Sequence, residues 1–132
     1  MTTKHVTAST LKLTQAQIDK LDDAIKKYSC ILGMNDWRIA SRLKDLGEDS
    51  LAQCHVDGGN RIISIHVNEN WPSLDDTTNE LFELTMIHEI LEGMLSQTRD
   101  LLFEHYKEEF VDEHIHSIIR RLEKALYKEI LK

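Results

Sequence analysis

The segment from about Thr78 to Leu95 limits the possible folds more than any other part of the chain. Apolar residues cover most of its helical surface instead of a single stripe, which is typical of a buried helix. These residues are Leu81, Phe82, Leu84, Met86, Ile87, Ile90, Leu91, Met94 and Leu95. We therefore expect this segment to be the central helix of the protein.

A single domain is expected around this helix. The chain has 132 residues, of which 41% are hydrophobic, and that is enough for one core. Residues 1–10 are small and polar. We expect them to form a loose arm ahead of a domain that spans residues 11–132.

The first half of the domain reads as one helix followed by a strand. Thr14 and Gln17 have the spacing of a capping box and stand before an apolar stripe, which predicts a helix from Thr14 to Leu32 that stops at Gly33. In residues 36–43, apolar and polar residues alternate. This alternation predicts a first strand.

A hairpin should follow. Residues 51–56 and 61–67 read as two further strands, and Asp57-Gly58-Gly59-Asn60 between them supplies residues that a tight hairpin needs at positive φ. Residues 68–78 contain the only proline and many turn formers. We expect a loop there that crosses the sheet.

A last helix is expected from about Glu108 to Leu131, with charged residues opposite an apolar stripe. The stripe consists of Val111, Ile115, Ile118, Ile119, Leu122 and Leu126. The predicted order is therefore one helix, three strands and two helices. This is an α+β fold with a three-stranded antiparallel or mixed sheet.

Composition excludes several classes of function. With 23 acidic and 16 basic residues the net charge is -7, and no basic run stands out, so nucleic acid is not an expected partner. Cys30 and Cys54 form neither a CxxC pair nor a disulfide framework, which favours a cytoplasmic protein. The first residues lack the apolar stretch of a signal peptide, and no run approaches the roughly 20 apolar residues of a membrane span, so we expect neither element.

The central helix carries one polar stripe, formed by Thr85, His88, Glu89 and Glu92. Burying carboxylates among apolar residues is costly unless they are paired or bound to a cation. A zinc ion would compensate them, because ligands at i and i+4 meet at one point and the residue at i+1 can reach a metal-bound water. The pattern is HExxE, with Glu92 where HExxH has its second histidine.

The last helix offers candidates for a third ligand. His116 stands beside the apolar stripe and could face the central helix, and His114 borders the stripe on its other edge. Glu109 and Glu113 lie close to the line of His116 and are further alternatives. The pattern of residues favours His116 and keeps the other three open.

The segment from Thr85 to Leu95 resembles one that reads HEIIEAIN in small phage and prophage proteins with a zincin-like metallopeptidase core. In those proteins the last helix carries His, then Ile, Leu and Tyr at plus three, six and eleven. This sequence matches with His116, Ile119, Leu122 and Tyr127. The resemblance covers nearly the whole chain and implies a zincin-like minimal core.

The resemblance also implies roles for individual residues. His88, Glu92 and His116 would hold zinc, and Glu89 would be the general base for peptide or amide hydrolysis by a zinc-bound water. The partner would be a peptide or protein substrate, or a host protein, in the host cell cytoplasm. Glu92 departs from ordinary zincins, which weakens the expectation of proteolysis more than that of metal binding.

Two other functions compete with hydrolysis. The first is a non-catalytic zincin-like phage accessory or host-interaction protein with a structural metal or none. The second is a helical adaptor without metal, in which Glu89 and Glu92 pair with a basic residue. The basic candidates are Arg99, Arg120 and Arg121.

Hydrolysis would need a further donor for the oxyanion. Loop and strand-end histidines gather at functional sites. The candidates are His55, His66 and His105.

Overall fold

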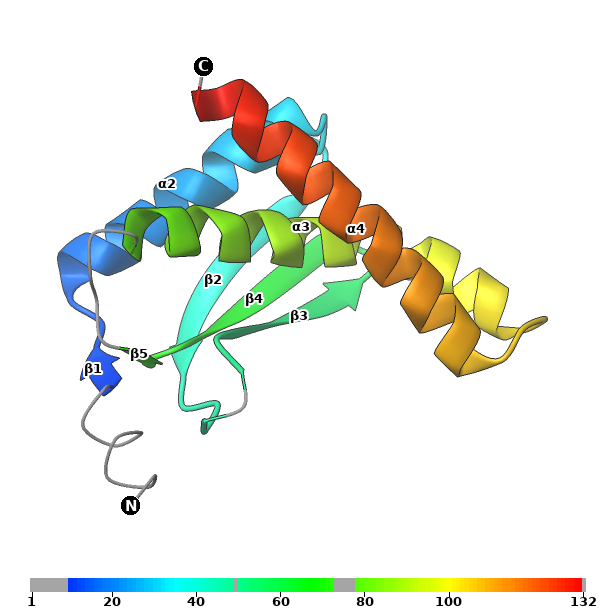
Figure 1. The fold of residues 1–132 in the computed structure, drawn as a ribbon, viewed down its shortest axis with the longest axis horizontal. Helices are drawn as coiled ribbons and strands as arrows, with labels where there is room; N and C mark the ends of the chain where they lie inside the picture. Colours follow the sequence, from blue (N-terminus) through cyan, green and yellow to red (C-terminus); the bar gives the residue numbers. More distant parts are fainter. Residues whose placement is uncertain (1–9, 49, 73–77, 132) are drawn as a thin grey trace.

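A computed structural model of the chain describes residues 10–48, 50–72 and 78–131 (Figure 1). Along the chain it contains β1 (Thr10–Lys12), α2 (Gln15–Ile31), β2 (Arg38–Lys44), β3 (Ala52–Asp57), β4 (Ile62–Asn68), β5 (Asn70–Pro72), α3 (Thr78–Phe103) and α4 (Glu108–Leu131). The predicted α+β order of one helix, three strands and two helices is confirmed. The short strands β1 and β5 are additional elements.

The main sheet has three strands in the order β2-β4-β3. The central strand β4 runs parallel to β2, with Ile63 opposite Ile39, and antiparallel to β3, with Ile63 opposite Val56. The sheet is therefore mixed, which is one of the two predicted forms. Both β2 and β3 are edge strands among the described residues.

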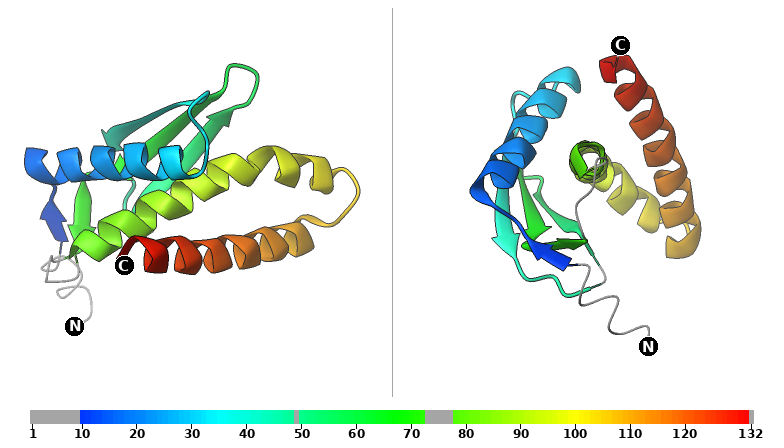
Figure 2. Two further views of the ribbon diagram at one scale, coloured as in Figure 1. Left: turned by 90° about the horizontal axis from the view of Figure 1, so that it is seen from above. Right: turned by 60° about the vertical axis from the view of Figure 1, so that its left-hand side comes forward.

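The molecule has three layers. Helices α2 and α3 lie on one face of the sheet, and α4 packs on the side of α3 that faces away from the sheet (Figure 2). The residues of α3 that are essentially inaccessible to solvent are Met86, Ile87, Ile90 and Leu91. The prediction of a central, buried helix is therefore confirmed.

Gly93 allows α3 to approach the sheet closely. A Cβ atom at this position would lie 2.8 Å from Ile63 Cδ1 and 3.3 Å from Cys54 Sγ. Glycine in a helix costs about 1 kcal/mol relative to alanine. Here that cost is offset by close packing next to the polar stripe.

Helix α2 begins as predicted and is tied to α3. Thr14 and Gln17 form the expected capping box, and the backbone at Gly33 has a φ of 71° just beyond the end of the helix. The buried hydroxyl of Tyr28 donates a hydrogen bond of 2.6 Å to Glu83 on α3. This bond fixes the two helices that cover the sheet relative to each other.

The expectation of an irregular loop over residues 68–78 is wrong for Asn70–Pro72, which form β5. This strand pairs antiparallel with β1, so Thr10 at the end of the predicted arm belongs to a strand. Trp71 is fully buried, and its Nε1 donates to the Asn68 carbonyl at 2.7 Å. Anchoring of this side chain outweighs the local turn preferences, while residues 1–9 and 73–77 lie outside the described residues.

The connection between β3 and β4 also differs from the prediction. Its non-glycine residue at positive φ is Arg61, at 54°, and neither Gly58 nor Gly59 has a positive φ. The Asp57 carboxylate closes the turn by accepting hydrogen bonds from the backbone and side chain of Asn60. Gly58 lies close to α3: a Cβ there would lie 2.5 Å from Gln97 Nε2, the end of an exposed side chain that can move away.

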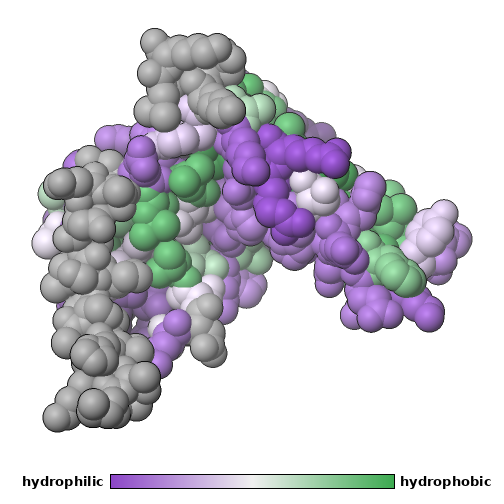
Figure 3. Space-filling view, in the orientation of Figure 1, coloured by the Kyte–Doolittle hydropathy of each residue, from purple (hydrophilic) through white to green (hydrophobic). Residues whose placement is uncertain are grey.

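Helices α3 and α4 form a long hairpin that extends beyond the sheet (Figure 1). Helix α3 continues to Phe103 and is longer than predicted, whereas α4 has the predicted bounds. At the end of the hairpin Leu101, Tyr106 and Phe110 are 65%, 64% and 62% exposed, and Figure 3 shows apolar surface there. Among the described helices, none is both long and apolar enough to cross a bilayer.

Candidate metal centre

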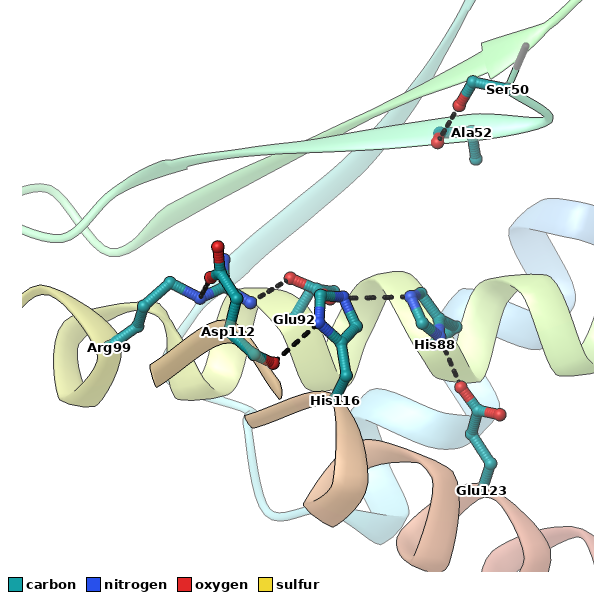
Figure 4. Close-up of polar contacts among 8 residues, drawn as sticks. All are labelled: Ser50, Ala52, His88, Glu92, Arg99, Asp112, His116 and Glu123. Carbon is teal, nitrogen blue, oxygen red and sulfur yellow. Dashed lines mark hydrogen bonds and ion pairs between the residues drawn. The ribbon is translucent and has the colours of Figure 1, made fainter. Parts of the chain in front are cut away.

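Three of the predicted residues meet between α3 and α4. His88 and Glu92 stand one turn apart on α3, and His116 reaches them from α4 (Figure 4). One ligand atom from each lies within 4.8 Å of the other two, and all three side chains are half-buried. Two imidazoles and a carboxylate are a donor set that zinc binds.

The Nδ1 atom of the His88 ring is hydrogen-bonded to Glu123 of α4. His88 Nδ1 lies in a short hydrogen-bonding contact with the Glu123 carboxylate, which requires the proton to be on Nδ1. The other nitrogen, Nε2, faces Glu92 Oε1 at 3.5 Å. A carboxylate behind a histidine in this way orients the ring and makes its free nitrogen a better metal ligand.

His116 is oriented in the same manner by the backbone. Its Nδ1 lies 2.8 Å from the Asp112 carbonyl oxygen, one turn earlier in α4. Since a carbonyl only accepts hydrogen bonds, the proton is on Nδ1. His116 Nε2 then points to Glu92 Oε1 at 3.0 Å, so both histidines present Nε2 to the same carboxylate oxygen.

The second oxygen of Glu92 is occupied by Arg99. Arg99 Nη2 lies 2.6 Å from Glu92 Oε2, and Arg99 Nε lies 3.5 Å from the Asp112 carboxylate. Side-chain exposure is only 20% for Arg99 and 14% for Glu92. Glu92 therefore has one oxygen, Oε1, available to a metal.

Glu89 lies beside this cluster and faces a groove of about 370 Å³ between α3 and the start of β3. Ser50, Ala52 and Glu123 line the same groove. Glu89 is 7% exposed and makes no hydrogen bond or ion pair within the described ranges. Its carboxyl group is thus free to exchange a proton with a molecule in the groove.

The pKa values of His88, Glu89 and Glu92 on α3 are shifted strongly and in different directions. The hydrogen bond to Glu92, with support from Glu123, raises the pKa of His88 to about 9. Hydrogen bonds from His88 and Arg99 lower the pKa of Glu92 to about 2. Burial, with the nearby charges of Glu92 and Glu123, raises the pKa of Glu89 to about 7. Without a metal, the imidazolium of His88 therefore lies between two carboxylates.

The alternative ligands do not join the cluster. His114, Glu109 and Glu113 are exposed on α4, and the described group contains His116 in their place. Of the three basic residues considered for pairing, Arg99 does pair with Glu92, whereas Arg120 and Arg121 are exposed.

The three histidines considered as oxyanion donors lie away from the site. His55 and His66 lie on the sheet face that points away from α3, because side chains alternate along a strand. Their sequence neighbours Cys54 and Ile65, which stand opposite each other in the sheet, point the other way: Cys54 lies next to Gly93 of α3, and Ile65 is buried. His105 is exposed in the connection between α3 and α4. None of them faces the groove beside Glu89.

Glu123 and the Asp112 carbonyl are the functional groups that the sequence interpretation missed. Glu123 stands seven residues after His116, which places it on the same face of α4 two turns later. That spacing was a usable signal.

Comparison of the chain with protein-family models, curated proteins and solved structures finds no match.

Proposed function

We propose that this protein is a phage-type, zinc-dependent metallopeptidase-like hydrolase that cleaves peptide or amide bonds. The observation that carries the proposal is the convergence of two histidine Nε2 atoms and Glu92 Oε1, with both Nδ1 atoms already held by acceptors. Such orientation is what a metal site needs before the metal arrives. When bound, zinc would polarise a carbonyl group and make water more acidic.

The residues of the chain have separate roles in this proposal. His88, Glu92 and His116 hold the metal, and Glu89 removes a proton from the attacking water. A pKa of about 7 for Glu89 suits this role, because a general base works best when its pKa is close to the working pH. The leaving amine then takes the proton back from Glu89.

The edge of β3 supports an extended peptide as substrate. The Leu51 carbonyl accepts from the Asn68 amide on β4, so alternation turns the main-chain groups of Ala52 to the free edge. The Ser50 hydroxyl donates to the Ala52 carbonyl at 2.7 Å (Figure 4), so the Ala52 N–H is the group that a peptide would meet directly. Ala52 also lines the groove that contains Glu89. A peptide that adds to this edge would be held by main-chain hydrogen bonds and need little sequence specificity.

The proposal is tested with protein purified without a histidine tag. The parent should contain one zinc per chain and cleave denatured casein or a mixed peptide library, and Glu89→Gln should keep the zinc and lose cleavage. His88→Ala should lose both, while the exposed His114→Ala should lose neither. Cleavage by Glu89→Gln at the parental rate would refute the catalytic role, and absence of zinc from the parent would refute the metal site.

The ion pair between Arg99 and Glu92 favours a second candidate, a zincin-like accessory protein with a structural metal or none. Arg99 already neutralises the ligand carboxylate at 2.6 Å, which reduces the need for a metal. In this case the parent would lack cleavage of every peptide tested, and Glu89→Gln would leave its biological effect unchanged. Stoichiometric zinc would then be structural.

A further inference from the structure

The sheet face that points away from α2 and α3 carries a group of basic residues from three strands. Arg42 on β2 stands directly opposite His66 on β4, and His55 on β3 stands opposite Ser64. Lys44 follows Arg42 two residues later on the same face. We call Arg42, Lys44, His55 and His66 the basic cluster; it is invisible in the sequence because its members are scattered.

The basic cluster has no acidic partner in the described part of the chain. The ion pairs found there involve neither Arg42 nor Lys44. The rings of His55 and His66 lie 4.4 Å apart between their centroids. Burial, followed by the nearby basic groups His55, Lys44 and Arg42, lowers the pKa of His66. The neutral form of this ring is therefore favoured, and the permanent positive charge of the cluster lies on Arg42 and Lys44.

Basic side chains that stand close together on one sheet face destabilise the sheet unless an opposite charge lies between them. The chain has 23 acidic residues, yet none of those described forms an ion pair with Arg42 or Lys44. An anion from outside the chain would balance these two charges.

A hollow between β2 and β4 gives such an anion a place. Its volume is about 200 Å³, and Arg42, Ser64 and His66 are among the residues that line it. The Ser64 hydroxyl and the Arg42 guanidinium are hydrogen-bond donors, and Arg suits the oxygens of a phosphate group. His66 Nδ1 is buried without a hydrogen-bond partner among the described residues, so this nitrogen could hydrogen-bond to an oxygen of the anion.

We infer that this hollow binds the phosphate group of a small phosphate monoester. A monoester has a compact double charge and three free oxygens, which matches several donors around one hollow better than a singly charged diester. The site lies on the opposite side of the sheet from the proposed metal centre and does not depend on it. The protein would thus have a second, anion-recognising surface.

The inference is tested by NMR titration of the protein with inorganic phosphate and with glycerol 3-phosphate at constant ionic strength. We expect saturable shifts of the amides of Arg42, Lys44, Ser64 and His66, with a dissociation constant on the order of 1 mM. Tighter binding of the ester would show that the rest of the ligand contacts the sheet. Equal binding would show that phosphate alone is recognised.

Substitutions separate this site from others. Replacing Arg42 and Lys44 together by glutamine should weaken binding about tenfold or more, whereas the same change at Arg120 and Arg121 removes equal charge from exposed positions of α4 and should have no effect. His116→Ala should bind phosphate like the parent, which separates this inference from the metal proposal. The inference is overturned if sodium chloride causes the same shifts, if the shifts map to His88 and His116, or if only an oligonucleotide binds.

Discussion

His88 on α3 and Glu123 on α4 are joined by a hydrogen bond through Nδ1 of the imidazole. The two residues are 35 positions apart in sequence and lie on the two arms of the helical hairpin. The bond sets the direction of the His88 ring, and therefore of the nitrogen that faces Glu92 and His116. The packing of α4 on α3 thus determines the geometry of the candidate metal centre.

Glu123→Gln should weaken zinc binding about ten- to a hundredfold, which is the usual effect of removing a residue that orients a metal-bound histidine. Competition with a chromophoric chelator measures the affinity. Glu113→Gln is the matched control, because it removes the same charge from an exposed position of α4. Equal loss of affinity in both variants would show that only overall charge matters.

Arg99→Met should destabilise the metal-free protein by about 1–3 kcal/mol, because it removes a charged hydrogen bond from the partly buried Glu92. Zinc should then stabilise the variant more than the parent, since the metal supplies the positive charge that Arg99 provided. Urea unfolding with a chelator and with zinc measures both effects. Arg120→Met serves as the exposed control, and an equal gain from zinc in parent and Arg99→Met would contradict the prediction.

Zinc affinity should rise about tenfold for each pH unit between pH 7 and 9. His88 has a pKa raised to about 9, so below this pH a proton must leave before the metal binds. The increase should level off above pH 9, where His88 is already neutral. Calorimetry in buffers of different ionisation enthalpy should detect at least one proton released per zinc at pH 7; no release would mean that His88 is not a ligand.

Gly93→Ala should destabilise the protein by about 1–3 kcal/mol, as overpacking of a core does. The added Cβ would lie 2.8 Å from Ile63 Cδ1, and this penalty exceeds the gain in helix propensity. Ile63→Val removes the contacting atom, so the double variant should recover most of the loss relative to Ile63→Val alone. Thermal unfolding of the four proteins in a double-mutant cycle measures this coupling, and additive effects would argue against the contact.

The parts of the fold that could be predicted are those with strong periodicity. Helix α4 has the predicted bounds because its apolar stripe is regular over its length. Helix α3 continues past Leu95 because Leu102 and Phe103 still pack against the core, which a gap in the apolar pattern concealed. Strands of three residues such as β1 and β5 have no detectable period, and their pairing depends on the burial of Trp71.

The candidate site could be predicted where a single helix carries the pattern. His88 and Glu92 follow from their spacing on α3, and His116 needed the resemblance as a second indication. The tautomers of the histidines could not be predicted from the sequence. That of His88 depends on Glu123, which contacts it from the neighbouring helix α4, and that of His116 depends on the Asp112 carbonyl one turn earlier in α4. The basic cluster escaped detection because strand register, and not sequence, brings its members together.

The close approach of Gly93 to Ile63 has a consequence for sequence evolution. A methyl group at position 93 and a full-length isoleucine at position 63 compete for the same space, because a Cβ on Gly93 would lie 2.8 Å from Ile63 Cδ1. A chain with this fold should therefore carry alanine at position 93 only together with a side chain shorter than isoleucine at position 63. The fold thus constrains the two positions as a pair, although 30 residues separate them along the chain.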